Sequence, residues 1–223
     1  MTTAPPVIAV DGPTASGKGT VASLVAAKLG LHYLDSGAIY RVLGVAAAHA
    51  GLSPEAAPDL ARIVAMSAAL PVRFKGDRVL LDGKDVSDEI RSEVAGSMAS
   101  KLAAVPGVRA GLLQRQRDFR VAPGLVADGR DMGSVVFPDA ALKVFLTASA
   151  QVRAERRVKQ LQSRGVSANF QVIYNDLVER DKRDTERAVA PLKPCHDALV
   201  LDCSGIGIDE VVQTILRWAG ERI

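Results

Sequence analysis

Residues 7–20 read VIAVDGPTASGKGT, in which an apolar run at 7–10 leads into a glycine-containing loop and then into an apolar-rich stretch at 20–29. The loop has the GxxxxGK spacing of a phosphate-binding loop, a motif that requires a strand before it and a helix after it. Glycines let backbone N–H groups point at phosphate oxygens, the helix N-terminus adds partial positive charge, and the lysine reaches the outer phosphates. The stretch therefore predicts a strand, a loop and a helix that bind a nucleoside triphosphate through Gly12, Pro13, Thr14, Ala15, Ser16, Gly17, Lys18, Gly19 and Thr20.

The residue after Lys18 departs from the commonest form of this motif. It is Gly19 rather than Ser or Thr, and the hydroxyl comes one place later, at Thr20. A hydroxyl at this point of the loop is a typical magnesium ligand, so we expect Thr20 to hold Mg²⁺ directly or through water. A chance glycine-rich turn is the alternative, and the lysine with its flanking strand and helix patterns disfavours it.

The rest of the chain alternates apolar strand patterns with helical patterns. Strands are predicted at 31–35, 124–127, 142–146 and 199–201, and helices at 37–50, 53–69, 93–104, 106–121, 149–164, 168–188 and 209–219. Ser53-Pro54-Glu55 supplies an N-cap and a first-turn proline for the helix at 53–69. The alternation implies parallel strands with right-handed crossovers, so the predicted fold is α/β with a doubly wound parallel sheet.

The pattern changes between residues 71 and 86. Three short extended pieces are separated by Lys75-Gly76-Asp77 and by Asp82-Gly83, which are typical turn sequences. We therefore expect a small antiparallel meander inserted into the α/β chain.

Composition excludes several classes of protein. Hydrophobic residues are 48% and charged residues 24%, as in an ordinary globular chain, and 28 Lys plus Arg against 25 Asp plus Glu leave a net charge of only +3. Aromatic residues are 4%, and no basic stripe is present, so neither base stacking nor duplex binding is favoured. No apolar run has the length of a membrane span, residues 1–6 lack a secretion-signal pattern, and the two cysteines, Cys195 and Cys203, form no metal or disulfide framework. We expect a cytoplasmic monomer with no nucleic-acid or membrane partner.

The segment Asp128-Gly129-Arg130-Asp131-Met132-Gly133 follows a predicted strand. The carboxyl ends of parallel strands form the crevice where open α/β sheets bind ligands. A carboxylate there can hold magnesium through water, and an arginine can bind phosphate. A turn with a solvated Asp-Arg pair is the alternative.

Two predicted helices each carry a charged face. Arg153, Arg156 and Arg157 share one face, and Arg180, Asp184 and Arg187 share another. On most helices such patterns are exposed ion-pair ladders. In a protein with a phosphate-binding loop they also suit phosphoryl transfer, because transfer between two anions needs several positive groups around it.

Five motifs together resemble the bacterial type of cytidylate kinase, in the nucleoside monophosphate kinase family of P-loop kinases. They are GPTASGKGT at 12–20, LDSGAIYR at 34–41, a serine at 100 followed by VR at 108–109, DGRDMGSVVFPDA at 128–140 and ERDKRDTERAVAPL at 179–192. The resemblance runs nearly end to end and includes the GKGT variant. It implies a sheet core with an inserted monophosphate-binding domain and a short lid, divided as core at 1–35, monophosphate-binding domain at 36–103, core at 104–150, lid at 151–167 and core at 168–223.

The resemblance implies an activity and a role for individual residues. The γ-phosphoryl group of ATP would pass in line to CMP or dCMP in pyrimidine nucleotide metabolism, with Mg²⁺ bound and with Lys18, Arg130 and Arg157 as catalytic residues. Arg153 and Arg156 are rivals of Arg157 as the arginine that acts on the transferred group. Ser36, Arg41, Arg130 and Arg187 would hold the acceptor phosphate, Ser100, Arg109 and Asp131 would read cytosine, and Arg180 with Asp184 would bind the sugar.

Two other functions remain open from the sequence. One is a small P-loop kinase that acts on adenylate, uridylate or a metabolite hydroxyl. The other is a non-catalytic nucleotide-gated protein that binds RNA, which the scarce aromatic residues disfavour.

Overall fold

The computed structural model describes residues 4–75, 78–163 and 165–223, which divide into two compact units. The core unit combines the chain up to Leu34 with Phe119–Ile223, and the inserted unit is Asp35–Asp118. Residues 1–3, part of the predicted turn at 75–77 and one residue of the predicted lid at 151–167 lie outside the described residues.

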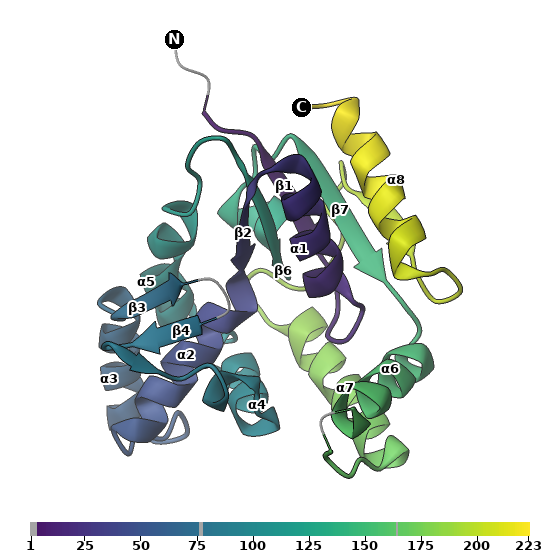
Figure 1. Ribbon diagram of the computed structural model, residues 1–223. Helices are drawn as coiled ribbons and strands as arrows, with labels where there is room; N and C mark the ends of the chain where they lie inside the picture. Colours follow the sequence, from purple (N-terminus) through teal and green to yellow (C-terminus); the bar gives the residue numbers. More distant parts are fainter. Residues whose placement is uncertain (1–3, 76–77, 164) are drawn as a thin grey trace. The chain divides into compact units, whose positions relative to one another are not determined.

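A five-stranded sheet forms the centre of the core unit (Figure 1). Its strand order is β2-β6-β1-β7-β8, and the pairs β1–β6, β1–β7 and β7–β8 are parallel. The strands are β1 (Val7–Asp11), β2 (His32–Asp35), β6 (Leu125–Gly129), β7 (Leu142–Thr147) and β8 (Leu199–Asp202). Every residue of β1 and β6 is buried, as expected of central strands in a parallel sheet.

Among its described residues, the core unit has four α-helices: α1 (Lys18–Leu29), α6 (Ala150–Gln162), α7 (Phe170–Glu186) and α8 (Ile208–Gly220). Figure 1 shows α1 and α8 side by side on one face of the sheet, where Val25 and Ile215 pack with Ile8 and Val144. Full burial of each such side chain contributes roughly 1.5–3 kcal/mol. The helices α6 and α7 pack on each other. None of the helices in the described ranges is long and apolar enough to cross a membrane.

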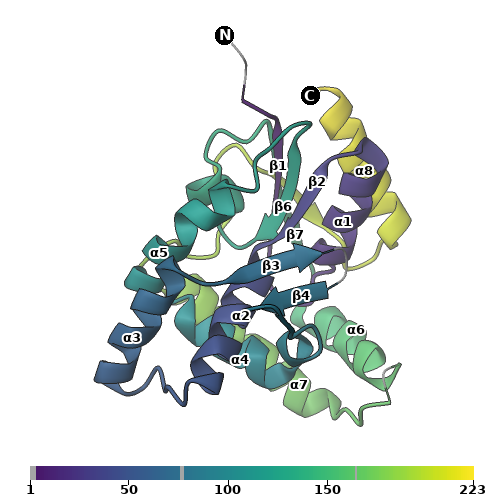
Figure 2. The same cartoon turned by 60° about the vertical axis from the view of Figure 1, so that its left-hand side comes forward.

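The inserted unit contains helices and a small sheet. Its elements are α2 (Ser36–His49), α3 (Ala57–Ala68), β3 (Val72–Lys75), β4 (Arg78–Leu81), β5 (Lys84–Asp85), the 3₁₀ turn η1 (Glu89–Arg91), α4 (Glu93–Leu102) and α5 (Pro106–Arg117). Figure 2 shows β3 and β4 as the longer strands of the antiparallel meander, as the sequence predicts.

The close packing of α5 on α3 explains why α5 clusters with the inserted unit. A Cβ atom on Gly111 would lie 2.0 Å from the Ser67 hydroxyl oxygen, so glycine lets the two helices meet. The division of the chain at Asp118 therefore differs from the sequence-based division after residue 103.

The α/β fold class is confirmed, while two local predictions are wrong. The helix expected from Ser53 begins at Ala57, because the Ser53 hydroxyl donates to the Glu55 carboxylate and Pro58 occupies the first turn. The helix at 106–121 ends at Arg117, since the backbone N–H of Val121 turns back to the carbonyl of Phe119. Residues 132–136, for which no helix or strand is predicted from the sequence, form a turn of π-helix, η2 (Met132–Val136).

Candidate active site

The predicted phosphate-binding loop joins β1 to α1. A Cβ atom on Gly12 would lie 2.0 Å from the carbonyl oxygen of Leu146, so only glycine fits where the loop leaves the sheet beside β7. Gly17 has φ 90°, a left-handed conformation that glycine adopts without strain, and it precedes α1 directly. None of the described side chains caps this helix. The loop therefore presents uncapped backbone N–H groups and the positive end of a helix dipole.

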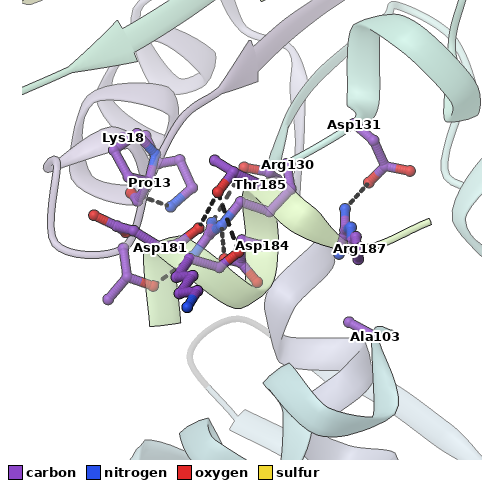
Figure 3. A network of polar contacts seen from close by, with 12 residues as sticks. Pro13, Lys18, Ala103, Arg130, Asp131, Asp181, Asp184, Thr185 and Arg187 are labelled. Carbon is purple, nitrogen blue, oxygen red and sulfur yellow. Dashed lines mark hydrogen bonds and ion pairs between the residues drawn. The ribbon is translucent and has the colours of Figure 1, made fainter. Parts of the chain in front are cut away.

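Lys18 lies across the loop. Its side chain is buried, and its Nζ donates to the carbonyl oxygen of Pro13 at 3.2 Å, a contact visible in Figure 3. Ser16 is also buried, and its hydroxyl has no hydrogen-bond partner among the described residues. Thr20 is exposed on the first turn of α1.

Gly19 faces a buried carboxylate on the neighbouring strand. Tyr33 donates its hydroxyl to Oδ1 of Asp128 at 2.6 Å. A Cβ atom on Gly19 would lie 3.5 Å from the Tyr33 hydroxyl oxygen and 3.9 Å from Oδ1 of Asp128. A side chain at position 19 would therefore begin in van der Waals contact with the Tyr33 hydroxyl and the Asp128 carboxylate, and glycine leaves that space open.

Asp11, which the sequence analysis did not single out, fixes the segment after β6. Its two carboxylate oxygens accept from the backbone N–H groups of Met132, at 2.8 Å, and of Gly133, at 2.9 Å. Burial raises the pKa of Asp11 to about 6, although these two hydrogen bonds oppose the rise. The carboxylate thus holds the first two residues of η2, which directly follow Arg130 and Asp131 in the chain. The sequence does contain a signal for this role, because Asp11 is an acidic residue at the end of an apolar strand pattern.

Arg130 connects three parts of the core unit. Its Nε donates to Oδ2 of Asp184 at 2.9 Å, and its Nη2 donates to the Thr14 hydroxyl of the phosphate-binding loop. Burial raises the pKa of Asp184, but Arg130, Arg180 and Arg187 outweigh that effect and hold the pKa below its ordinary value. Asp184 is therefore a buried anion among arginines, and Figure 3 shows it beside Arg130.

Asp131 and Arg187 face each other across the same unit. The Arg187 Nη2 atom lies 3.9 Å from Oδ1 of Asp131, and Figure 3 shows the two side chains directed toward each other. Both side chains are buried. The structure thus brings the phosphate-binding loop together with Arg130 and Asp184, and Asp131 together with Arg187.

The three arginines of α6 have different surroundings. Arg153 and Arg156 donate to backbone carbonyls of the phosphate-binding loop, at Thr14 and Ser16 respectively. Arg157 donates to the side chain of Gln160 on its own helix. The predicted common face therefore divides into two arginines that contact the loop backbone and a third that contacts a helical neighbour.

Four candidate residues lie in the inserted unit. Arg41 donates to the carbonyl of Ile90, and Arg109 donates to the carbonyl of Ala103, one helical turn beyond Ser100. Ser100 is buried, and its hydroxyl has no hydrogen-bond partner in the described part of the chain.

Ser36 has a partner that sequence reasoning missed. It donates at 2.8 Å to the side-chain oxygen of Gln116, which is 2% exposed and donates in turn to the carbonyl of Leu112. A glutamine in a charged helix gives no sequence signal for this role.

Comparisons with known proteins agree over nearly the whole chain. A family model described as cytidylate kinase matches residues 8–221. A curated cytidylate kinase of Chromobacterium violaceum is 56% identical over 217 residues, which cover 97% of this chain and 96% of the relative. One from Bordetella pertussis is 57% identical over 213 residues, which cover 96% of this chain and 94% of the relative. Among solved structures, an uncharacterized protein from Eubacterium ventriosum aligns over 97% of this chain and 99% of its own, with a TM-score of 0.53 and 10% identity, and this likeness concerns the fold alone.

Proposed function

Because the chain belongs to the cytidylate kinase family, we propose that it transfers the γ-phosphoryl group of ATP to CMP or dCMP, which yields ADP and CDP or dCDP. The observation that carries this proposal is the contact of Arg130 with both the phosphate-binding loop, at Thr14, and the buried carboxylate of Asp184. This contact joins the loop expected to hold the donor to the side chains expected to hold the acceptor. Identity to curated relatives along nearly the full chain favours this kinase over the RNA-binding alternative.

The reaction needs positioning and charge stabilisation more than acid–base chemistry. The phosphate oxygen of CMP that attacks is already anionic at neutral pH, so no strong general base is required. Lys18 and the backbone N–H groups of the loop would bind the β- and γ-phosphates of ATP. Arg130, and Arg157 from α6, would stabilise the charge that spreads over the transferred group.

Magnesium fits the oxygen donors beside the loop. Thr20 is exposed on the first turn of α1, and the Asp128 carboxylate faces the space beside Gly19, where a Cβ atom would lie 3.9 Å from its Oδ1. Mg²⁺ keeps several waters and usually takes one or two protein oxygens together with substrate phosphates. We propose that Thr20 and Asp128 hold it, in part through water, and when bound it would neutralise charge on the β- and γ-phosphates.

Acceptor recognition is proposed for side chains of both units. Ser36, Arg41, Arg130 and Arg187 would bind the phosphate of CMP, and Arg180 with Asp184 would bind its sugar. Asp131 accepts hydrogen bonds only, which suits the exocyclic amino group of cytosine. The buried Ser100 hydroxyl, which lacks a partner among the described residues, and Arg109 suit the acceptor atoms of the ring. Uracil has a carbonyl in place of the amino group, so UMP is expected to be the poorer acceptor.

The two units have proposed roles as well. The inserted unit would be the monophosphate-binding domain, and residues 151–167 would form a short lid whose closure excludes water from ATP.

We further propose a cytoplasmic monomer, since Cys195 and Cys203 are free thiols and the family's reaction needs one active site. Light scattering after size exclusion should give a mass near 23.5 kDa, and a mass twice as large would contradict the monomer.

An assay of ADP release across a panel of acceptors tests the function. CMP and dCMP should support turnover far above the rate without acceptor, while UMP should be used less well and AMP hardly at all. Lys18→Ala serves as the inactive control and should lower kcat by orders of magnitude, about 100-fold or more. Preference for AMP, or for an acceptor hydroxyl, would contradict the proposed substrate.

A further inference from the structure

Two backbone carbonyls of the phosphate-binding loop are bound by side chains from outside the loop. The carbonyl oxygen of Thr14 accepts from Nη1 of Arg153 at 3.1 Å. The carbonyl oxygen of Ser16 accepts from Nη1 of Arg156 at 3.2 Å, and Sγ of Cys203 lies 3.2 Å from the same oxygen and 3.0 Å from the carbonyl oxygen of Thr147. All these groups lie in the core unit.

These contacts determine where two backbone N–H groups point. A trans peptide is planar, and its N–H points opposite to its C=O. A guanidinium that holds the Thr14 carbonyl therefore turns the N–H of Ala15 to the opposite side, and the contacts at Ser16 do the same for the N–H of Gly17. Ala15 has φ 59°, a left-handed conformation that costs a residue with a side chain about 1–2 kcal/mol. The arginines provide contacts that can offset this cost.

Each arginine is itself held in place. Arg153 is 4% exposed, its Nε donates to the carbonyl of Ala148 at 2.9 Å, and its Nη atoms pair with both carboxylate oxygens of Asp181 on α7. Arg156 also donates through Nη2 to the carbonyl of Cys203, just after β8. Each guanidinium group therefore binds a carbonyl of the loop and at least one further group of the core unit at the same time.

We propose that Arg153 and Arg156 are positioning residues that hold the phosphate-binding loop in its anion-binding shape, with Asp181 orienting Arg153. They would act through the N–H groups of Ala15 and Gly17. This inference rests on the proposed function only in that the loop binds the phosphates of the donor nucleotide.

Calorimetric titration with ADP, without acceptor, tests the inference. Arg153→Met and Arg156→Met should each weaken ADP binding by about 10-fold or more, because a loop N–H no longer meets the phosphate. Lys159→Met is the matched control, since it removes an exposed cation of the same helix, and it should change ADP affinity less than 2-fold. In steady-state kinetic assays, the KM for ATP should rise in the two arginine variants, while the KM for CMP should stay within about 2-fold of the wild-type value.

A double-mutant comparison isolates the contribution of Asp181. Asp181→Asn should weaken ADP binding in the wild-type chain, and it should add no further loss in the Arg153→Met background. Arg153→Lys keeps the positive charge but loses the planar guanidinium group, so its ADP affinity should remain lower than that of wild type. Unchanged ADP affinity in the arginine variants, equal losses from Asp181→Asn in both backgrounds, or full recovery in Arg153→Lys would each overturn the proposal.

The proposed function can fail independently of this inference. If the wild-type chain bound ADP but did not phosphorylate CMP, the ADP titrations would still decide the roles of Arg153 and Arg156. If an arginine variant did not fold, Asp181→Asn measured in the otherwise wild-type chain would still test the effect on ADP affinity.

Discussion

Removal of the Asp184 carboxylate tests the buried charge cluster at the centre of the site. Asp184→Ala would leave Arg130 without the acceptor that lies 2.9 Å from its Nε. The Asp184 side chain is 6% exposed and that of Arg130 is 16% exposed, so water compensates little for the loss. Arg180 and Arg187 also lower the pKa of Asp184 and would lose the same anion. Breaking a buried pair from one side costs about 3–5 kcal/mol, and we expect a loss of that size.

Urea denaturation at pH 7 measures the loss as a change in the free energy of unfolding. Glu179→Ala on the same helix is the matched control, because its partner Arg183 is 3.9 Å away and the two side chains are 69% and 36% exposed. This control should cost less than about 0.5 kcal/mol. Inorganic phosphate should stabilise Asp184→Ala more than wild type, since it can replace the missing anion. A loss below about 1 kcal/mol for Asp184→Ala would refute the reasoning, because solvent would then screen the cluster as it screens an exposed pair.

Three other changes give distinct outcomes. Gly12→Ala should lower the free energy of unfolding by about 3 kcal/mol or more in urea, because its Cβ would lie 2.0 Å from the Leu146 carbonyl oxygen; a loss under about 1 kcal/mol would contradict this packing. Asp11 has its pKa raised from 3.8 to about 6 by burial, so its contribution to stability is present below the unfolded-state pKa and is lost as pH rises through 6. The stability of wild type relative to Asp11→Asn should therefore fall by at most about 3 kcal/mol between pH 4 and pH 7, and a rise over that range would contradict the assignment. Asp131→Ala should reduce the preference for CMP over UMP in kcat/KM by about 10-fold or more, and an unchanged ratio would rule out its role in reading the base.

The sequence predicted the parts of the fold whose causes are local. The strand, glycine loop and helix at 7–29 were predicted correctly because the GxxxxGK spacing requires a strand before the loop and a helix after it. The meander was predicted correctly because turn residues separate its short extended pieces. Ser53 was misassigned because its hydroxyl could cap a helix or bind a neighbouring side chain, and the competing partner was the nearby Glu55.

The missed parts of the site depend on partners that are distant in sequence. Asp11 acts on backbone groups at 132 and 133, and Gln116 orients the hydroxyl of Ser36. The helical spacing of Arg153 and Arg156 predicted that they share a face. The spacing could not show that this face contacts the backbone of the phosphate-binding loop, because only tertiary structure joins positions so far apart.

The most direct test of the central claim follows the transferred phosphoryl group itself. The chain is incubated with ATP labelled at the γ-phosphorus, CMP and Mg²⁺, and the products are separated. In-line transfer predicts that the label appears in the β-phosphate of CDP, one for each ADP formed, and that no labelled protein accumulates. Label recovered as inorganic phosphate at a rate independent of CMP, or label retained on the chain, would contradict the account.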